Sequence, residues 1–423
     1  MQHATLQLIN ELGLRVVKQP WFAEESGMDG EANFSSGSSV PLSEAENREL
    51  TAVCERLEGW AASVRNPQSW TACRDAVDWD GQSVQQYLDL NVASTAVRRE
   101  LELLVRTTTA SEPSDMSFLY FLYFLGICGG VAGVGDGDGG AQTYKICGGA
   151  QQLSTRLAAE LAARGVPVRL NSAVARITRK PDGAVWVDTR AGAQLEAACL
   201  VAALSPPLWR SIEWSPPLSA AKQAIADRMY MGSVVKVIAL YDTNFWEPFR
   251  PRGLLEQLGP VSNLFPSSVG GAPALIGLVV GTDARAFAAL PEAERRRRVL
   301  AQYAAYFGDG AAERGCVRFM SKDWTGEAYS RGGYAALMPP GLATSAGAAF
   351  RQPEGTVVFA GTELARRWAG YFEGAVESGY RAAYDAAELL RLRQGTGVEA
   401  TRAAGGSMMG REGGQACAAR SKL

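Results

Sequence analysis

Near the end of the chain stand the runs Thr356-Val-Val-Phe-Ala-Gly-Thr-Glu363 and Trp368-Ala-Gly-Tyr-Phe-Glu-Gly-Ala-Val-Glu-Ser-Gly379. The β-branched and aromatic residues at 357–359 are typical of a fully buried strand. Gly361 lets the backbone turn sharply beside a ligand, because glycine has no Cβ. Beyond Gly370 small residues recur at helical spacing, so one helix face can lie against another backbone or a flat ring. The stretch predicts a strand, a glycine turn and a helix whose N-terminus favours an anionic ligand, although periodicity alone also fits an ordinary strand–helix unit.

Composition places the chain among globular proteins of two or three domains, since 47% of its 423 residues are hydrophobic and 20% are charged. A net charge of −2 gives no broad electrostatic case for binding nucleic acid. The basic run at 295–298 follows a helix-start pattern, so we interpret it as a solvated helix face. No apolar run is long enough to predict a transmembrane helix, and no signal peptide is recognised.

Cysteine and histidine usage narrows the chemistry further. The seven cysteines include no C-x-x-C pair and are odd in number, which is typical of free thiols in a reducing compartment. His3 is the single histidine, which argues against a histidine-based triad and a histidine metal site, and no metal is predicted. The chemistry must therefore come from a cofactor or from other side chains.

Helical and strand-like blocks alternate along the chain. We predict helices at 6–14, 44–64, twice within 80–107, and at 117–128, 151–164 and 291–307. Strands are predicted at 168–170, 173–178, 184–188, 199–203, 234–240 and 274–280. This alternation predicts a mixed α/β fold of two interleaved domains rather than two consecutive ones.

The two C-terminal runs, F-A-G-T-E and W-x-G-Y-x-E-G-A-V-x-S-G, resemble the flavin-binding signature of the flavin-dependent amine oxidases, the monoamine and polyamine oxidases. The resemblance extends over about 6–390. It implies an FAD-binding, Rossmann-like domain made of 1–18, 157–235 and 328–393, and a substrate-binding domain made of 19–156 and 236–327. The substrate domain is expected to hold a mixed sheet backed by helices, and 394–423 to be a flexible tail.

One expected feature of that family is missing. Such flavoproteins open with a strand, G-x-G-x-x-G and a helix, which hold the pyrophosphate. The only textual match, Gly135-Asp-Gly-Asp-Gly-Gly140, follows no strand and carries two aspartates that would repel a pyrophosphate, so we interpret it as a loop. The FAD-binding domain is thus predicted to be incomplete. The chain is then a truncated form or gene-model fragment of an oxidase, or a cofactor-free, non-catalytic relative that acts as a binding protein.

The resemblance implies three catalytic residues. Tyr334 and Tyr371 match paired aromatic rings that form a corridor for the amine in front of the flavin, although either tyrosine alone more often packs in a core. Lys236 lies in the apolar strand 234–240 and matches a lysine that holds a water beside flavin N5 and assists oxygen reduction. A solvent-facing lysine on an edge strand is the alternative.

Further positions are implied by the same resemblance. Residues expected to bind FAD are Val174, Trp324, Gly361, Thr362, Glu363, Gly370 and Phe372. Cys128 and Gln142 are expected to line the substrate cavity. Read alone, Trp324 would be a core tryptophan, Gln142 a polar loop residue and Cys128 a small buried hydrophobe. The position of the cysteine that tethers flavin in some relatives is Gly333, so noncovalent binding of FAD is expected.

The expected reaction passes the amine Cα–H as hydride to flavin N5; the imine hydrolyses, and O2 is reduced to hydrogen peroxide. The sequence does not determine the amine: monoamine, polyamine, amino-acid and histone-demethylase-like oxidases all remain candidates. An amino-acid oxidase would need an arginine to bind the substrate carboxylate, and no such arginine is recognised. The last residues, Ser421-Lys422-Leu423, match a peroxisomal address, which predicts a peroxisomal location and an import receptor as partner. A homodimer is left open.

Overall fold

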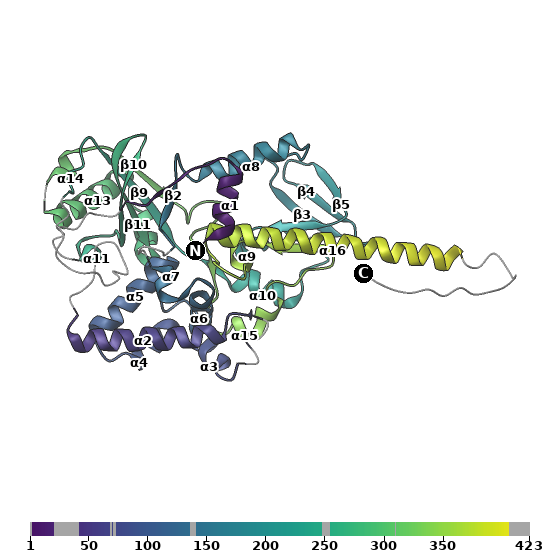
Figure 1. Cartoon of the computed structure of the whole chain (residues 1–423), viewed down its shortest axis with the longest axis horizontal. Coiled ribbons are helices and arrows are strands. Elements are labelled where there is room, and N and C mark those ends of the chain that lie inside the picture. The colour runs from purple at the N-terminus through teal and green to yellow at the C-terminus, as the bar shows by residue number, and fades with distance from the viewer. Residues whose placement is uncertain are drawn as a thin grey trace, which may run out of the picture.

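The computed structural model describes residues 2–20, 42–67, 70, 73–135, 141–247, 254–308 and 310–405, with side chains up to residue 393. Most of the glycine-rich run at 135–140 and the whole of 421–423 lie outside these residues. Figure 1 shows a helical layer at the lower left, a sheet with its own helices above it, and a smaller sheet at the right beside the long C-terminal helix. This is the mixed α/β class that the sequence predicts.

The helical layer is built around one helix that is apolar on all sides. It contains α2 (Glu44–Ser63), α3 (Ala76–Asp80), α4 (Val84–Asn91), α5 (Thr95–Thr109), α6 (Phe118–Ile127) and α7 (Gly130–Val134). Ser43 and Ser83 begin α2 and α4 with capping boxes, which pair backbone N–H groups that the helices cannot use. The residues of α6 are buried apart from Gly126, since other elements cover every face of it. Phe118 stacks on Tyr87 with ring centroids 4.0 Å apart.

The sheet of the left half has the strand order β10-β11-β9-β12. Its strands are β9 (Val234–Tyr241), β10 (Asn263–Val269), β11 (Ala272–Val280) and β12 (Cys316–Asp323), and the expected mixed sheet is antiparallel in all three pairings. Nearby helices are α11 (Leu255–Leu258), α12 (Gly281–Ala288), α13 (Glu292–Phe307) and α14 (Ala311–Arg314). Alternate residues of β9, such as Val235 and Val237, are buried with Val299 and Tyr303 of α13. The other face of β9 is left for a cavity.

The right half contains a second sheet, of order β5-β4-β3-β7, and a parallel pair of strands. The second sheet comprises β3 (Val174–Arg179), β4 (Val185–Thr189), β5 (Gln194–Ala197) and β7 (Glu213–Ser215). The parallel pair is β6 (Leu200–Ala203) with β14 (Val357–Ala360), and β14 is buried throughout. Around them lie α8 (Gln151–Ala163), α9 (Pro206–Trp209), α10 (Ala220–Arg228), α15 (Ala343–Ala346) and α16 (Phe372–Gly405). The predicted strand, turn and helix at 357–379 are therefore confirmed.

Short elements join the two halves. These are α1 (His3–Glu11), β1 (Val16–Lys18), β2 (Tyr144–Ile146), β8 (Tyr230–Met231) and β13 (Ala336–Leu337). The strands β1 and β2 form an antiparallel ribbon, and β8 pairs with β13. Glu373 in the first turn of α16 accepts backbone N–H bonds from Ala4 at 3.0 Å and Thr5 at 2.7 Å. A carboxylate at the N-terminus of α1 is favourable because it meets unpaired N–H groups and the positive end of the helix dipole.

Two predictions of secondary structure are wrong. The predicted strand at 168–170 is not a strand, and Val168 and Leu170 are exposed by 49% and 80%. Its alternating pattern finds no partner strand among the described residues, and a strand needs a paired neighbour for its backbone groups. The predicted flexible tail also begins too early, because α16 continues as a helix through Gly405.

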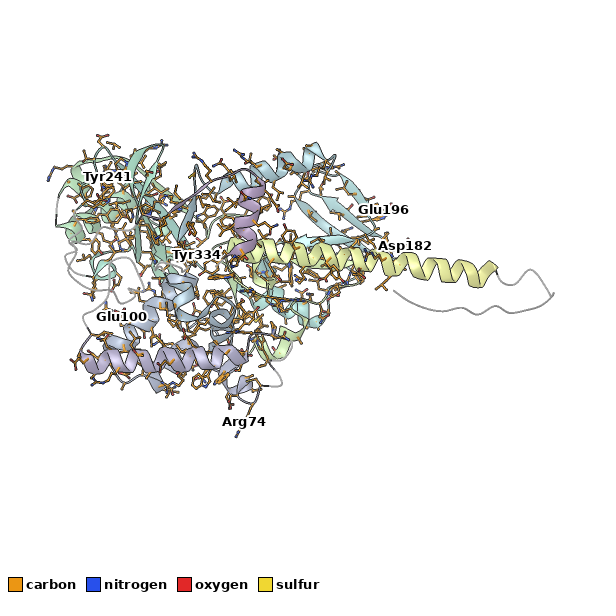
Figure 2. All side chains as sticks on the ribbon, viewed as in Figure 1. Arg74, Glu100, Asp182, Glu196, Tyr241 and Tyr334 are labelled. Carbon is orange, nitrogen blue, oxygen red and sulfur yellow. The ribbon has the colours of Figure 1, made fainter. Side chains whose placement is uncertain are left out.

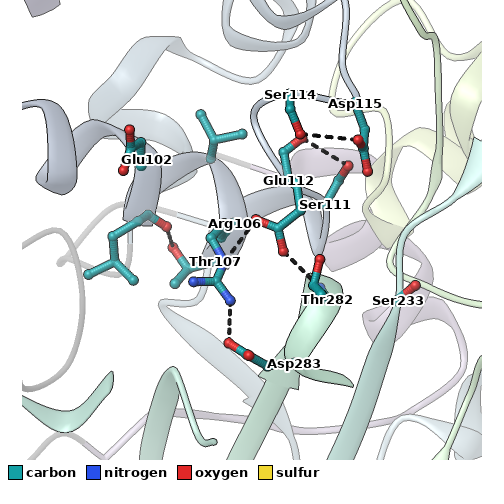
Figure 3. Close-up of polar contacts among 12 residues, drawn as sticks. Glu102, Arg106, Thr107, Ser111, Glu112, Ser114, Asp115, Ser233, Thr282 and Asp283 are labelled. Atoms are coloured by element: carbon teal, nitrogen blue, oxygen red, sulfur yellow. Dashed lines mark hydrogen bonds and ion pairs between the residues drawn. The ribbon is translucent and has the colours of Figure 1, made fainter. Parts of the chain in front are cut away.

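A polar cluster ties the helical layer to the sheet (Figure 3). Arg106 near the end of α5 contacts Asp283 of α12 at 2.5 Å and Glu112 at 3.4 Å. Glu112 also accepts the backbone N–H of Thr282 at 2.7 Å. The cluster therefore holds the end of α5, where Thr107 borders the cavity, against the sheet.

Candidate active site

A cavity of about 1090 Å³ lies where the parts of the fold meet. It is bounded by α1, the β1–β2 ribbon, the end of α5, the middle of α6, the open face of β9–β11, residues 334–337 and the start of α16. Figure 2 places Tyr334 near the centre of the molecule, between the left sheet and the start of α16. Elements from both halves thus contribute to one cavity.

Strand register determines which sheet residues reach this cavity. Residues Asn263, Leu278 and Lys236 form one row across β10, β11 and β9, and Phe265 with Ile276 lies in the next row on the same face. All five line the cavity. Residues in directly opposed antiparallel positions share a face, so this row follows from the pairing.

Lys236 is the basic residue among these five cavity-lining residues of the sheet. Its pKa is lowered, first by burial, which disfavours the charged ammonium, and second by the positive charge of Lys145. The expectation of a solvent-facing edge lysine therefore does not hold, because β9 is an inner strand of its sheet and Lys236 lines the cavity. A lysine in this setting carries a larger neutral fraction at a given pH than an exposed one.

The glycine turn joins β14 to α16 through Thr362. Its Oγ1 accepts the backbone N–H of Gly370 and donates to the carbonyl of Tyr371, both at 2.8 Å. Gly361 has a φ of +134° and Gly370 a φ of +89°, which L side chains rarely adopt. Ser378 Oγ of α16 accepts the N–H of Gly361 at 3.2 Å. These bonds hold the turn against the first turns of α16, where Gly370, Tyr371 and Phe372 line the cavity.

Glu363 is almost fully buried and joins three segments. Its Oε1 accepts the Ser205 hydroxyl and, at 3.0 Å, the backbone N–H of Ala336. Ser205 follows β6, while Ala336 begins β13, two residues after Tyr334. Glu363 therefore connects the glycine turn to the segment that carries Tyr334.

Both predicted corridor tyrosines line the same cavity, from separate segments. Tyr334 precedes β13 and keeps 37% of its surface exposed. Tyr371 immediately precedes α16 and meets the buried Trp368 edge-to-face, with ring centroids 5.3 Å apart. The two phenols therefore share one cavity, and their pairing as a corridor stays a prediction.

The predicted residues divide into those at the cavity and those away from it. Lining it are Lys236, Tyr334, Tyr371, Thr362, Glu363, Gly370, Phe372 and Gln142. Cys128 does not line the cavity. Its buried thiol donates to the carbonyl of Ala369, a cavity-lining residue, at 3.6 Å, and burial raises the pKa of the thiol. Val174 and Gly361 do not line it either, although Gly361 adjoins Thr362. Trp324 follows β12 and does not line the cavity either. Its side chain is 41% exposed, and its ring centroid lies 5.5 Å from the Lys322 ammonium.

Several lining residues were not predicted. They include Lys18 and Tyr144, which the β1–β2 ribbon brings together, and Asn263. Sequence reasoning missed the ribbon because its two strands are three residues each and more than 120 positions apart. Strands this short carry no local pattern from which their pairing could have been predicted.

The surroundings of the turn fit the ring end of a flavin. The positive-φ glycines leave the backbone close to the cavity, and the N-terminus of α16 favours negative charge there. Within the described ranges no strand is followed by G-x-G-x-x-G and a helix, so this fit concerns the ring and not the pyrophosphate.

Other kinds of site are not found in the described residues. No cluster of His, Cys, Asp and Glu among these residues could hold a metal ion. The six cysteines that the structure describes are free thiols. No described helix combines the length and apolar character needed to cross a bilayer.

Comparison with known proteins gives one consistent result. The family model described as flavin containing amine oxidoreductase matches residues 1–387. The chain is 34% identical over 397 residues to AofH of Mycobacterium tuberculosis, which bears the name of a flavin-containing monoamine oxidase; the match covers 92% of this chain and 84% of that one. It is 30% identical to a flavin-containing amine oxidase of Oncorhynchus mykiss, covering 90% and 73% of the two chains.

Solved structures agree. Cyclohexylamine oxidase from Brevibacterium oxydans superimposes with a TM-score of 0.79 at 29% identity, covering 92% of this chain and 86% of that one. A putrescine oxidase bound to putrescine gives a TM-score of 0.79 at 26% identity, covering 91% and 85%. The turn, the long helix and the cavity described above thus occur in a chain that belongs to the flavin-containing amine oxidoreductase family and is an FAD-dependent amine oxidase by class.

Proposed function

We propose that this chain oxidises a small amine at the cavity between Tyr334, Tyr371 and Lys236. The observation that supports this is that both phenols, the lysine and the first turn of α16 line one cavity. When bound, FAD supplies the redox chemistry by accepting a hydride from the amine α-carbon and passing the electrons to O2, which yields hydrogen peroxide. Hydrolysis of the released imine completes the proposed reaction.

The chain's own residues would bind and orient the reactants. The faces of Tyr334 and Tyr371 attract an approaching ammonium and orient the neutral amine that reacts. Phe124 and Ile276 contribute apolar wall, which keeps water away from the reacting carbon. Lys236 would hold a water close to the ring, since its amino group forms hydrogen bonds to water and burial lowers its pKa.

We propose that the FAD is held without a covalent bond. Gly333, next to Tyr334, has no side chain that could form a thioether. Thr362, Gly370 and Phe372 would lie along the ring, with the helix N-terminus at the edge where negative charge builds on reduction.

The visible absorption spectrum of the purified full chain tests this proposal. Bound oxidised flavin gives a band at roughly 450 nm, which anaerobic addition of an oxidisable amine bleaches. After O2 is readmitted, the amount of hydrogen peroxide formed should equal the amount of amine consumed. Protein that shows no such band after reconstitution with FAD would support the cofactor-free binding protein instead.

We also propose that Ser421-Lys422-Leu423 directs the protein to peroxisomes through an import receptor. Deleting these three residues should leave a fluorescently labelled protein in the cytosol, because the receptor reads the free C-terminal tripeptide. Replacing 418–420 by other small or basic residues serves as the control. Unchanged organelle import after the deletion would contradict the proposed address.

A further inference from the structure

Asn263, the first residue of β10, brings an unsatisfied amide to the wall of the cavity. The residue is 4% exposed, and its Oδ1 has no hydrogen-bond partner among the described residues. It lies in one row with Leu278 and Lys236, on the face of the sheet that lines the cavity. A buried oxygen without a partner costs free energy, because it loses its hydrogen bonds to water and gains none in return. The terminal torsion of an asparagine side chain is broad, so a ligand in the cavity can bond this amide and remove the cost.

The end of α5 adds further hydrogen-bond acceptors to the same wall. Residues Thr107–Thr109 line the cavity, and their hydroxyls donate to carbonyls one turn earlier in α5, at 2.8, 2.6 and 2.6 Å. A hydroxyl whose proton is used in this way keeps lone pairs for accepting. Ala110, the next residue, packs in one cluster with Leu278, which lies opposite Asn263. The wall formed by Asn263 and the three threonines therefore favours a ligand that donates hydrogen bonds.

This wall carries no carboxylate. Glu363 is the only acidic residue among the described residues that line the cavity, and it belongs to the glycine turn. An ammonium placed at Asn263 would lose its hydration without meeting an opposite charge, and Lys236 lies in the same row. A neutral donor such as a hydroxyl avoids both costs.

Strand spacing separates this wall from the reacting end of the cavity. Asn263 and Lys236 lie two strand spacings apart, with β11 between them, so their Cα atoms are roughly 10 Å apart. An amine held near Lys236 and the two tyrosines would thus bring its far end, and not its α-carbon, to Asn263.

We propose that the cavity takes amines that carry a neutral hydroxyl at the end remote from the reacting nitrogen, and that Asn263 accepts the hydrogen bond of this hydroxyl. The inference rests on the proposed oxidase function and adds a substrate class to it. An amine with an apolar far end leaves the oxygen of Asn263 unsatisfied. A diamine brings a charge to a wall that has no carboxylate.

Three amines with a six-carbon chain separate these cases: 6-aminohexan-1-ol, hexylamine and 1,6-diaminohexane. With the FAD-loaded full chain, kcat/KM measured by oxygen consumption should be highest for the amino alcohol and lowest for the diamine. The amino alcohol should exceed hexylamine by roughly tenfold, because a site that bonds a hydroxyl discriminates against the analogue that lacks it.

Two substitutions of similar size make the test specific to Asn263. Asn263→Leu removes the polar atoms and should reverse the preference, so that hexylamine becomes the better substrate. Asn263→Asp keeps an acceptor and adds a negative charge, so it should raise kcat/KM for the diamine by roughly tenfold, and it tests the position even where the leucine variant does not fold. Asn91→Leu is the matched control and should keep the wild-type ratios, because Asn91 bonds the carbonyl of Tyr87 outside the cavity.

A binding measurement separates this inference from the proposed function. Hexane-1,6-diol carries no amine, and its dissociation constant for the full chain, measured by ligand-observed NMR, should rise roughly tenfold in Asn263→Leu and not in Asn91→Leu. If no amine is oxidised but the diol still binds through Asn263, the oxidase proposal fails and the hydroxyl site stands. If amines are oxidised but the wild type prefers the diamine, or Asn263→Leu leaves the substrate ratios unchanged, the hydroxyl site is overturned and the oxidase proposal stands.

Discussion

At the scale of single residues, Lys236 owes its chemistry to one position of strand register. Its neighbours in the sequence, Val235 and Val237, are fully buried in the core of the left sheet. Successive residues of a strand face opposite sides, so Lys236 must point away from that core and into the cavity. A slip of one residue would place the ammonium among apolar side chains, which disfavours any other register.

We expect Lys236→Met to slow reoxidation of the flavin by O2 more than it slows anaerobic reduction by amine, because the methionine cannot hold the proposed water. Stopped-flow absorbance with each half-reaction measured separately gives both rates. Lys322→Met is the control: Lys322 stands opposite Lys236 on β12, but its ammonium bonds the exposed Glu327. Equal slowing of the two half-reactions by Lys236→Met would contradict the assigned role.

At the scale of elements, Thr362 connects the glycine turn to α16 with two hydrogen bonds from one hydroxyl. We expect Thr362→Val, which keeps the shape of the side chain, to lower the free energy of unfolding by about 1–3 kcal/mol, because the N–H of Gly370 and the carbonyl of Tyr371 lose this partner. Flavin content should fall too, since both residues line the cavity. Urea denaturation and the absorbance ratio of flavin to protein measure the two effects.

Thr356→Val is the matched control for this substitution. Thr356 Oγ1 makes a single hydrogen bond, to the carbonyl of Gly183 at 2.8 Å, outside the cavity. We expect it to leave flavin content unchanged. The same loss of flavin from both variants would show that general destabilisation, and not the turn, governs cofactor binding.

Lys222 links α10 to β14 and makes stability depend on pH. Its buried ammonium donates to the carbonyls of Ala349 at 2.9 Å and Phe350 at 3.2 Å, and lies 4.0 Å from the Phe359 ring centroid. Burial lowers its pKa from 10.5 to about 7, with Glu354 opposing and Arg381 reinforcing the shift. Between these pH values the unfolded chain binds the proton and the folded one releases it, so stability rises with pH in that window.

We expect the wild type to gain stability relative to Lys222→Met as pH rises from about 7 toward 10.5, by at most about 1.4 kcal/mol per pH unit. Urea denaturation of both proteins at several pH values measures the difference, and groups unaffected by the substitution cancel in it. A difference that stays constant across this window would mean that Lys222 keeps an ordinary pKa in the fold.

At the scale of the whole molecule, the cavity depends on how the helical layer is held against the sheet. Arg106, Glu112 and Asp283 provide one such connection, beside the cavity-lining Thr107. We expect Arg106→Met to lower the free energy of unfolding by about 1–3 kcal/mol, because the partly buried Glu112 and the exposed Asp283 lose their shared cation. Arg176→Met removes an exposed pair with Glu213 and should change stability by less than about 1 kcal/mol. Equal effects of the two substitutions in urea denaturation would show that the Arg106 cluster stabilises the fold no more than an exposed ion pair does.

Prediction from the sequence succeeded where the signal was local. The strand at 357–360, the glycine turn and the start of α16 follow from β-branched residues, a glycine without Cβ and helical periodicity. Prediction failed at 168–170, where alternation is present but the described residues offer no partner strand. Trp324 and Val174 were placed by resemblance alone, and neither lines the described cavity. The boundaries between the FAD-binding and substrate-binding domains stay a prediction.

The sequence alone determined the family of the chain and most of its strands and helices. It also identified Tyr334, Tyr371 and Lys236, because each lies in a short motif that matches the flavin-dependent amine oxidases. Only the tertiary structure brought Lys18 and Lys145 to the same cavity as Lys236, because that proximity arises from the β1–β2 ribbon and its contacts with β10. Pairing between distant strands is a property of the packed chain, in which backbone groups must find partners, and no local pattern in this sequence encodes it.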